Sequence, residues 1–426
     1  MQKFEAQTIV ARTGIAQPFR RVAAPAGMTA RTLEEVLVRV PRGLDPLFAA
    51  GRPWLAALAR PRLPVRLLRG CIAGGGSASV VAVGEGSLAE MLLDRFFDGE
   101  PARETGGSIG VHRLHARLSA HLDDVDLVLA VLPRPCAALA PRAMLRMPTV
   151  VEFTIDAASA VALSRARKTL RSDARRARAA GFTTRHTRDP AELAHFYDEF
   201  HLPMLARRFG TLGGAKPLTA LRRRLRSGGL VWLDYEGKAV AGDLYEIRGD
   251  TQRLLVHGRR PLDDPKLDPL VQLAVDLATM EVGHRQGCRT VDMGAAKPVP
   301  GSGLFARKRR FGATVRPRAS AQYELLIGWR QAGPAVHGFL RRAPLAIRRG
   351  DGLEALSALE DTGPADPRVA AKLRSDLLPD GIDRLTVLSA AGWLPARHDS
   401  VPGPDAVRLA GPLGSAALAA LGSGDG

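Results

Sequence analysis

Residues 289–312 read R-T-V-D-M-G-A-A-K-P-V-P-G-S-G-L-F-A-R-K-R-R-F-G and hold the densest run of structural signals in the chain. The β-branched residues in 289–293 predict a short strand, and the Gly and Pro residues in 294–303 predict a loop after it. A strand end would fix the carboxylate of Asp292, while the loop could close over a ligand. The four cations at 307–310 suit a phosphate or another polyanion, although a solvated surface turn is the alternative.

The same stretch resembles the C-terminal signature of the Fem-type peptidyltransferases and of related acyltransferases in the GNAT superfamily. That signature has a strand ending in Asp-x-Gly, a Gly/Pro loop and Gly-Leu-Phe-x-x-Lys-x-x-Phe-Gly. An aromatic residue commonly precedes the family's lysine, whereas this chain has Arg307 there. The resemblance implies an α+β fold, with a GNAT-like mixed sheet flanked by helices and two tandem GNAT-like halves. The matching positions are Asp292, Gly294, Gly303, Leu304, Phe305, Lys308, Phe311 and Gly312.

Length and charge bound the class of protein. A chain of 426 residues with 46% hydrophobic residues can form two or three domains with real cores. A net charge of +18 indicates a polyanionic partner, which could be nucleic acid, a nucleotide-containing donor or an anionic membrane surface. An arginine-rich compositional bias is the alternative source of this charge.

Cysteine usage and the N-terminus bear on the compartment. Cys71, Cys136 and Cys288 lie far apart without a C-x-x-C pair, so the spacing predicts neither a zinc site nor a disulfide framework. We find no signal-peptide pattern and no uncharged run of the ~18 residues that a membrane span needs. The sequence therefore predicts a reducing, cytoplasmic location.

We expect three domains. Residues 1–147 would form a degenerate GNAT-like N-terminal half and 148–345 the GNAT-like acyltransferase domain. Residues 346–426 would be a loop-rich C-terminal extension that is partly mobile, including a tail from Gly403. In the first and last of these ranges the expected strands are 37–40, 79–83, 126–132 and 384–388, and the expected helices are 87–97 and 351–359.

The first helix of the 148–345 range is strongly basic. It follows a predicted strand at 149–153 and is expected to run over 157–180, closing at Gly181. Seven Lys and Arg residues between 165 and 178 are opposed by one acidic residue, Asp173. Like charges repel one another unless an anion lies nearby, so this helix is a candidate polyanion contact. A solvated helix face is the alternative.

The next helix has a clear N-terminal signal. Asp189 is expected to cap it, Pro190 to occupy its first position and Glu192 to complete a capping box. Pro203 would then interrupt the helix. His201, just before that break, is a candidate substrate contact, although a hydrogen-bonded structural histidine is the alternative.

Residues 230–257 predict an antiparallel meander with turns at 236–237 and 249–250. Alternation puts Gly242 and Glu246 on one face of the middle strand and Asp243 and Tyr245 on the other. Glycine inside a strand suggests a bulge or the close approach of a ligand. By resemblance, this meander is the GNAT-like core, in which a bulged strand exposes a backbone amide to the acyl carbonyl.

The segment after the meander leaves the donor open. Arg259 and Arg260 follow the last strand, and a helix is expected at 268–287. Acyl-CoA enzymes of the GNAT superfamily have a Q/R-x-x-G-x-G/A loop at this junction, which holds a pyrophosphate on helix amides. This chain lacks that loop, which fits the Fem-like branch. A strand at 322–327 and an amphipathic helix ending at Arg342 complete the range.

These patterns predict an enzyme, an N-acyltransferase that moves an acyl group from acyl-CoA to an amine. One alternative is an aminoacyl-tRNA-dependent Fem-type peptidyltransferase. The other is a non-catalytic nucleic-acid-binding protein on a GNAT-like fold, for which 5% aromatic content favours phosphate contact over base stacking. The expected partner is a phosphate-bearing acyl donor, with tRNA and an anionic membrane surface as further candidates. No metal and no protein partner are expected.

Acyl transfer to an amine needs a base, donors for the oxyanion and cations for the donor's phosphates. Lys308 is expected to be exposed, and Asp292 to act either as a base or as an anchor of the loop. The candidate catalytic groups are Asp292, Asp243, Glu246 and the backbone at Gly242. The candidate phosphate-binding residues are Lys308, Arg307, Arg259 and Arg260. The candidate substrate contacts are His201, Tyr245 and Phe305.

Overall fold

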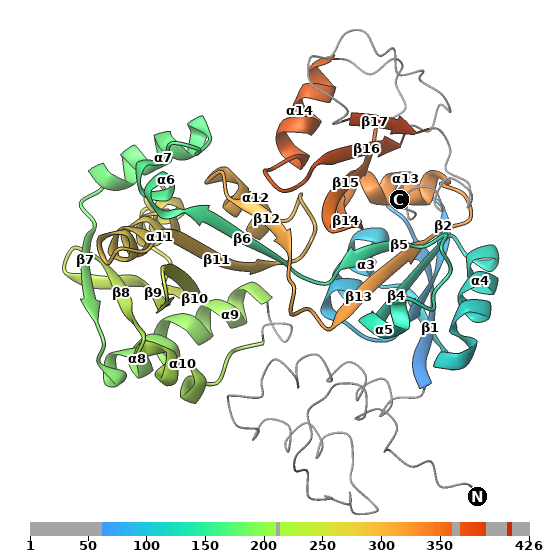
Figure 1. Ribbon diagram of the computed structural model, residues 1–426, viewed down its shortest axis with the longest axis horizontal. Coiled ribbons are helices and arrows are strands. Elements are labelled where there is room, and N and C mark those ends of the chain that lie inside the picture. The colour runs from blue at the N-terminus through green and yellow to red at the C-terminus, as the bar shows by residue number, and fades with distance from the viewer. Residues whose placement is uncertain (1–61, 210–213, 360–366, 389–406, 411–426) are drawn as a thin grey trace, which may run out of the picture. The chain divides into compact units, whose positions relative to one another are not determined.

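The computed structural model describes residues 62–209, 214–359, 367–388 and 407–410, which form three sheets with helices against them (Figure 1). The α+β class with mixed sheets flanked by helices, expected from the sequence, is confirmed. The strand predicted at 37–40 and most of the tail from Gly403 lie outside the described residues. The division into domains after 147 and 345 stays a prediction.

The first sheet has six strands in the order β3-β1-β2-β4-β13-β5. The fully buried strand β4 (Leu127–Pro133) and the helix α3 (Ser87–Phe96) confirm two expected elements. β13 (Tyr323–Gly328) pairs with both β4 and β5, so the 148–345 range supplies strands to both larger sheets. The remaining elements are β1 (Arg62–Cys71), β2 (Ser77–Val83), β3 (Ala102–Gly110), the 3-10 turn Val111–Arg113, α4 (Leu114–Asp124), α5 (Arg134–Ala137), β5 (Leu145–Pro148) and α13 (Pro334–Arg342).

The second sheet has seven strands in the order β12-β6-β11-β10-β9-β8-β7 and contains the predicted meander. β8 (Gly228–Tyr235), β9 (Lys238–Arg248) and β10 (Thr251–Arg259) follow one another antiparallel, which confirms that prediction. Glu236 and Gly237 both have positive φ angles, as a tight hairpin turn requires. The outer strands are β6 (Val151–Asp156), β7 (Thr183–Thr187), β11 (Thr290–Ala296) and β12 (Thr314–Pro317).

Strands β10 and β11 separate soon after they meet. They pair in parallel at three positions, the last being Arg253 with Asp292, although both strands run on beyond that point. A break in register between Asp292 and Ala295 marks the same place in the pairing of β11 with β6. Separated strands leave backbone groups without ladder partners, and other parts of the molecule must satisfy them.

Helices cover both faces of the second sheet (Figure 1). On one face, α11 (Asp268–Arg285) packs on β8, β9 and β10 and confirms the helix expected at 268–287. On the other face lie α8 (Pro190–Phe196) and α10 (Leu218–Leu225), which share a core with Trp232 of β8. The basic segment after the Gly/Pro loop is the helix α12 (Gly303–Arg310).

The single basic helix expected at 157–180 is two helices, so that prediction was wrong. α6 (Ala157–Ala162) ends where Leu163 adopts a left-handed backbone with a φ of 54°, and α7 (Lys168–Ala179) begins after a short connection. Leu163 is buried in the core of the second sheet, so tertiary packing outweighs the local helical periodicity. Gly181 follows α7 with a positive φ, as expected.

The helix that Asp189 caps continues through Pro203 rather than ending there. A π-helical turn, Tyr197–His201, joins α8 to α9 (Leu202–Phe209). The π turn changes the hydrogen-bond ladder just before a residue without an N–H, and so accommodates the proline. The expected capping box does not form, because the carboxylate of Glu192 turns to β8 instead.

The described part of the 346–426 range contributes strands to a third sheet, while residues 360–366, 389–406 and 411–426 of the expected loop-rich extension lie outside the described residues. β14 (Leu345–Arg349), β15 (Gly352–Ala358), β16 (Arg384–Leu388) and β17 (Val407–Ala410) pair in that order, and α14 (Pro367–Leu377) precedes β16 in the chain. The strand expected at 384–388 is confirmed, whereas the helix expected at 351–359 is β15. Nearly all of β15 is buried, so burial on both faces explains the apolar run that suggested a helix.

Candidate active site

A buried carboxylate–imidazole pair lies between β9 and β10. Asp243 and His257 stand opposite each other in the antiparallel pairing of these strands. His257 Nδ1 lies 2.6 Å from Asp243 Oδ1, and the two side chains are 15% and 4% exposed. A contact this short between buried groups fixes the imidazole ring and leaves Nε2 as its free nitrogen.

Helix α11 adds three polar side chains to this pair. Gln272, Asp276 and Thr279 recur at intervals of four and three residues, which places them on one face of the helix. Gln272 Nε2 lies 2.9 Å from Asp276 Oδ1 and 3.0 Å from His257 Nδ1. Thr279 Oγ1 lies 3.4 Å from Asp243 Oδ2. We call these five residues, Asp243, His257, Gln272, Asp276 and Thr279, the buried polar cluster.

Burial disfavours charge throughout the buried polar cluster. It raises the pKa of Asp243 to about 7 and that of Asp276 to about 6, and it lowers the pKa of His257 to about 3. The nearby positive charge of Arg307 opposes the rise in pKa at both carboxyls. The imidazole is therefore neutral at physiological pH, and the carboxyls hold a proton more readily than exposed ones do.

Guanidinium groups lie at the outer side of the cluster. Arg307 of α12 places Nη1 3.7 Å from Asp276 Oδ2 and keeps 28% of its side chain exposed. Arg208 and Arg259 are close enough to add to the lowering of the His257 pKa. Three members of the cluster also bring donor atoms within 4.8 Å of one another, a spacing that could hold a metal ion. The nearby guanidinium groups weaken the attraction of this position for a metal cation.

Several buried polar atoms at this place have no hydrogen-bond partner. Within the described part of the chain they include His257 Nε2, Asp276 Oδ2 and Arg307 Nε. Buried polar atoms are normally paired, and an unpaired one costs about 1–3 kcal/mol. Three unpaired atoms at one place, together with shifted pKa values, indicate a functional site.

The bulge predicted at Gly242 lies elsewhere, and the close approach there is made by the protein itself. Gly242 pairs regularly with both neighbouring strands, and a Cβ on it would lie 3.0 Å from the ring of Phe196. No bulge therefore frees its amide for a ligand. The register of β10 breaks instead at Leu255, and this shift of one residue brings His257 opposite Asp243.

Two other predicted residues of β9 have their own partners. Glu246 lies on the opposite face from Asp243 and is 1% exposed, with Arg224 Nη1 2.9 Å from its Oε2. Tyr245 is buried, and its hydroxyl lies 2.9 Å from His186 Nε2. The alternation predicted for β9 agrees with these contacts, and Asp243 is the predicted residue of this strand that joins the buried polar cluster.

His201 and Phe305, two of the predicted substrate contacts, are buried. His201 Nδ1 lies 2.6 Å from the backbone oxygen of His257, and burial lowers the pKa of His201. This contact favours the structural alternative for His201, because it supports the strand that carries the imidazole. Phe305 packs edge-on against Phe153, with ring centroids 4.8 Å apart.

Lys308 is buried, so the expectation that it is exposed was wrong. Its side chain is 2% exposed, and Nζ donates to Gly294 O and Ala295 O at 2.8 Å each. Both carbonyls belong to the part of β11 that has separated from β10. Burial lowers the pKa of Lys308 to about 7. The lysine therefore satisfies the backbone of the separated strands and does not face a solvent-borne phosphate.

Asp292 lies where strands β10 and β11 separate. Its Oδ1 accepts a hydrogen bond from Gly294 N at 2.7 Å, and its Oδ2 lies 3.1 Å from Arg253 Nε. Both oxygens are thus committed to local partners. These contacts favour the anchor role over the base role.

The predicted phosphate cations differ in how firmly they are held. Arg259 pairs with Asp268 in the first turn of α11, and Arg260 Nη2 lies 2.9 Å from Glu199 Oε2. Arg307 is held less firmly, because its ion pair with the cluster spans 3.7 Å. Of these cations, Arg307 lies against the buried polar cluster.

Sequence reasoning missed His257, Gln272, Asp276 and Thr279. A signal existed for Gln272 and Asp276, since they lie four positions apart on a helix whose buried residues are mostly apolar. Searching the predicted helix for such a polar pair would have found them. His257 gave no such signal, because its face depends on the bulge in β10.

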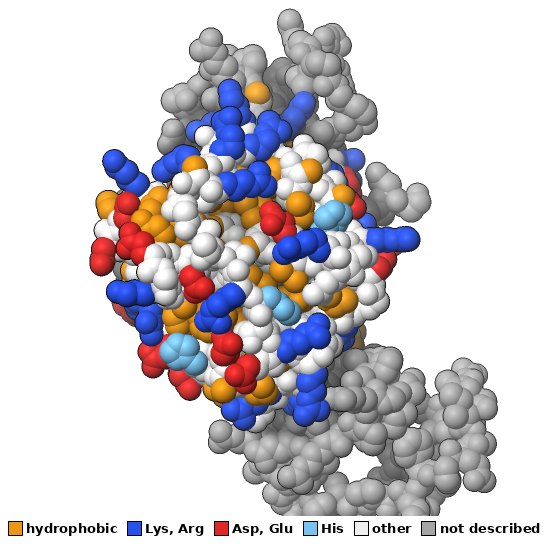
Figure 2. Space-filling view, turned by 90° about the vertical axis from the view of Figure 1, so that its left-hand side faces the viewer, with side chains coloured by type: hydrophobic (Ala, Val, Ile, Leu, Met, Phe, Trp, Pro, Cys, Tyr) orange, Lys and Arg blue, Asp and Glu red, His pale blue; other side chains and the backbone are white. Residues whose placement is uncertain are grey.

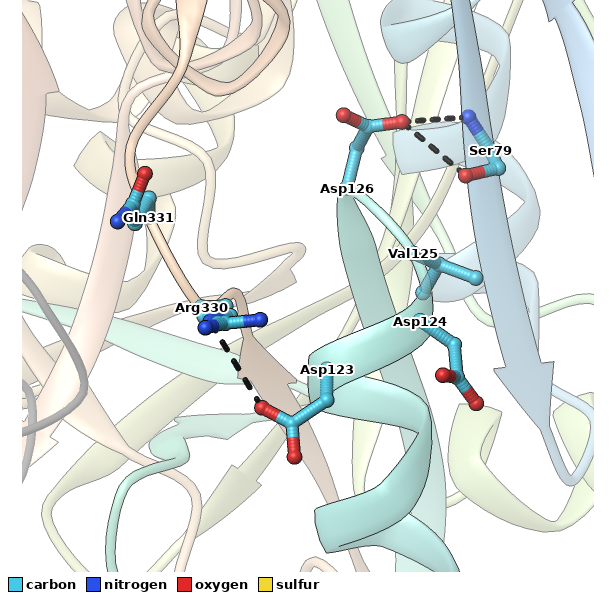
Figure 3. A pocket seen from close by; sticks show the side chains of 7 residues that line it. All are labelled: Ser79, Asp123, Asp124, Val125, Asp126, Arg330 and Gln331. Atoms are coloured by element: carbon cyan, nitrogen blue, oxygen red, sulfur yellow. Dashed lines mark hydrogen bonds and ion pairs between the residues drawn. The ribbon is translucent and has the colours of Figure 1, made fainter.

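A second polar feature lies in the first sheet, where a hollow has a volume of about 490 Å³. Asp126 Oδ2 accepts hydrogen bonds from Ser79 N and Oγ, and Arg330 Nε lies 3.9 Å from Asp123 Oδ1. The acidic side chains here are exposed, so the hollow lacks the burial that marks the cluster in the second sheet. It is lined by Ser79, Asp123, Asp124, Val125, Asp126, Arg330 and Gln331 (Figure 3).

Two further observations concern the cysteines and the possibility of membrane-spanning helices. Cys71, Cys136 and Cys288 are free thiols. Among the helices that the structure describes, none is long and apolar enough to cross a membrane.

Comparison with known proteins finds no matching family model and no matching curated protein. Solved structures match at low identity. FemX is 11% identical over 67% of this chain and 96% of its own, with a TM-score of 0.34. L-PGS from Bacillus licheniformis is 15% identical over 61% of this chain and 83% of its own, with a TM-score of 0.30. A GCN5-related N-acetyltransferase from Sphaerobacter thermophilus is 18% identical over 47% of this chain and 59% of its own, with a TM-score of 0.27.

Proposed function

We propose that the protein is an N-acyltransferase in which His257 accepts the proton of the acceptor amine. The observation that carries the proposal is the buried Asp243–His257 pair with its unpartnered Nε2. A neutral imidazole held by a carboxylate suits general-base catalysis. The resemblance of residues 292–312 to the Fem-type and GNAT acyltransferases supports the same class of reaction.

In the proposed reaction each member of the pair has a role. In the tautomer that carries its hydrogen on Nδ1, His257 donates to Asp243, and the lone pair of Nε2 can then take a proton from the amine as its nitrogen attacks the acyl carbonyl. Asp243 stabilises the imidazolium that forms, and the proton then passes to the leaving thiolate or ribose oxygen. The lowered pKa of about 3 keeps the ring neutral at physiological pH but also makes it a weak base, so proton transfer relies on the Asp243 carboxylate to stabilise the imidazolium.

The donor would be acyl-CoA, with aminoacyl-tRNA as the alternative, and the location would be the cytoplasm. Exposed cations, rather than the buried Lys308, would contact the phosphates of the donor. Figure 2 shows Lys and Arg side chains gathered on the upper part of the face that carries α7. Such a surface would also suit tRNA or the periphery of an anionic membrane. The exposed cations of α7 include Lys168, Arg171, Arg175 and Arg178.

Acyl transfer by the purified full-length protein tests the proposal. Acetyl-CoA and a mixture of aminoacyl-tRNAs are the donors, each is offered with a panel of primary amines, and products are identified by mass spectrometry. His257→Gln should lower kcat by at least ~10²-fold without unfolding the protein, because the amide cannot accept the proton. The exposed His195→Gln is the matched control and should behave as the wild type.

The outcomes distinguish three possibilities: acyl transfer with His257 as the base, acyl transfer without it, and nucleic-acid binding without catalysis. A wild-type kcat in His257→Gln would remove the imidazole from the reaction. Absence of transfer from both donors, combined with RNA retention that weakens steeply as salt rises, would show a non-catalytic nucleic-acid-binding protein instead.

A further inference from the structure

Arg307 is held loosely beside the buried polar cluster. Its Nη1 lies 3.7 Å from Asp276 Oδ2, too far for a hydrogen bond, and its Nε is buried without a partner within the described residues. The other predicted cations are committed: Arg259 and Arg260 to acids, and Lys308 to backbone carbonyls. Arg307 can therefore exchange its contact for a ligand at low cost.

The guanidinium of Arg307 and the proposed base share one neighbour. Asp276 has a carboxylate oxygen within 4.8 Å of a donor atom of His257, and its Oδ2 faces Arg307. His257 and Arg307 therefore lie beside the same carboxyl group, that of Asp276. A ligand that contacts both would carry a proton-donating atom and an anionic group separated by a few bonds.

This position does not suit the phosphates of acyl-CoA. The whole pantetheine arm separates those phosphates from the thioester, so a guanidinium next to the base meets the reacting end of the substrates. At that end, a planar guanidinium can bind a carboxylate through two parallel N–H···O contacts. Arg208 and Arg259 add positive potential here, because both act on the pKa of His257.

We propose that the acceptor is an amine that also carries a carboxylate, as an amino acid does, with the carboxylate bound by Arg307 and the amine delivered to His257 Nε2. This inference rests on the proposed acyl transfer. The ligand carboxylate replaces Asp276 as the partner of the guanidinium, while Asp276 keeps its bond to Gln272. Two fixed contacts orient the amine, so that its lone pair can face the acyl carbonyl.

The test uses amines that differ only in the carboxylate: a panel of L-amino acids, each paired with its primary amide. Calorimetry measures their binding to the full-length protein, and mass spectrometry measures their acylation. We expect amino acids to bind and react at least ~10-fold better than their amides, as one charge-assisted contact allows. Arg307→Gln should abolish this preference, so that amino acids and amides bind and react alike, and Arg307→Lys should restore part of it.

A matched variant controls for the loss of a cation from α12. Arg310→Gln removes a guanidinium that pairs with Asp173, and it should keep the carboxylate preference. The melting temperature of each variant shows whether it is folded. A preference that survives in Arg307→Gln, or that is lost equally in Arg310→Gln, would overturn the role of Arg307.

Failure of this inference can be told from failure of the proposed function. Equal acylation of amino acids and amides by the wild type would overturn the inference and leave the acyltransferase standing. An Arg307-dependent preference for carboxylates in binding, without acyl transfer from either donor, would keep the carboxylate site and overturn the acyltransferase. Binding of neither kind of amine would overturn the inference.

Discussion

Two buried acidic residues of this protein have opposite surroundings. Glu324 of β13 is 5% exposed and lies within ion-pair distance of three guanidinium groups, at 2.9, 3.6 and 3.9 Å. Asp276 of α11 is 2% exposed, yet the guanidinium that faces it lies 3.7 Å away. A second carboxyl group, that of Asp243, interacts with Asp276 directly.

The comparison distinguishes buried acidic residues that stabilise the fold from buried acidic residues that serve chemistry or binding. A structural carboxylate is surrounded by opposite charges, since an uncompensated buried charge costs several kcal/mol. Two carboxyls that share a site and keep raised pKa values destabilise the fold, and such a cost persists where chemistry or binding needs it. Mutations in the two places should therefore separate stability from activity.

The largest effect on stability should come from the fully compensated residue. Glu324→Gln leaves Arg348, whose side chain is 15% exposed, without its anionic partner. We expect the free energy of unfolding to fall by about 3 kcal/mol in urea denaturation. Glu104→Gln breaks the exposed pair with Arg69 in the same sheet and should change it by less than about 1 kcal/mol. Equal stability of the two variants would show that the arginine shell around Glu324 contributes nothing.

Asp243→Asn should have the opposite profile, with kcat about 10²-fold lower and a stability change within about 1 kcal/mol. The amide keeps the shape of the side chain but cannot stabilise an imidazolium at His257. Stability should change little, because a pKa raised to about 7 means that the fold does not stabilise the charge that Asn removes. Steady-state kinetics and urea denaturation measure the two quantities. A loss of several kcal/mol would instead class Asp243 with Glu324 as a structural group.

The elements around the buried polar cluster were predictable from local patterns. Alternation and glycine turns predict β8, β9 and β10, and a capped apolar stripe predicts α11. Alternation alone also places Asp243 on a defined face of β9. The fold class was implied by the resemblance of residues 289–312 to the Fem-type and GNAT acyltransferases.

The partner of Asp243 could not be found in this way. A regular hairpin around residues 249–250 would pair His257 with Gly242 and put Asp243 on the other face. The bulge at Leu255 moves His257 to the face of Asp243, and no local sequence pattern predicts this bulge. β13 is a similar case, since its pairing with β4 joins segments that are far apart in the chain.

The pH dependence of stability tests whether the ammonium group of Lys308 is buried. Burial lowers its pKa to about 7 from an ordinary value of 10.5, so above pH 7 the unfolded chain binds more protons than the folded protein. Stability should therefore rise with pH, by about 2 kcal/mol between pH 7 and 9, relative to Lys308→Met, which cannot titrate. The exposed Lys168→Met is the control. If the free energy of unfolding in urea had the same pH profile for the wild type and Lys308→Met, the Lys308 ammonium would be exposed to solvent.

The smallest effect is expected at Asp292, where the sequence left a base and an anchor as alternatives. Asp292→Asn keeps an oxygen for Gly294 N but removes the charge that faces Arg253, whose side chain is 30% exposed. Because that pair is partly exposed, stability should fall by only about 1 kcal/mol, and kcat should stay within about 3-fold of the wild type. Limited proteolysis should cut the 294–303 loop faster, since the carboxylate no longer ties its first residue as firmly. If kcat instead fell about 10²-fold with an intact loop, the base would be Asp292. The unpaired atoms of the buried polar cluster would then mark a binding site beside the chemistry and not the chemistry itself.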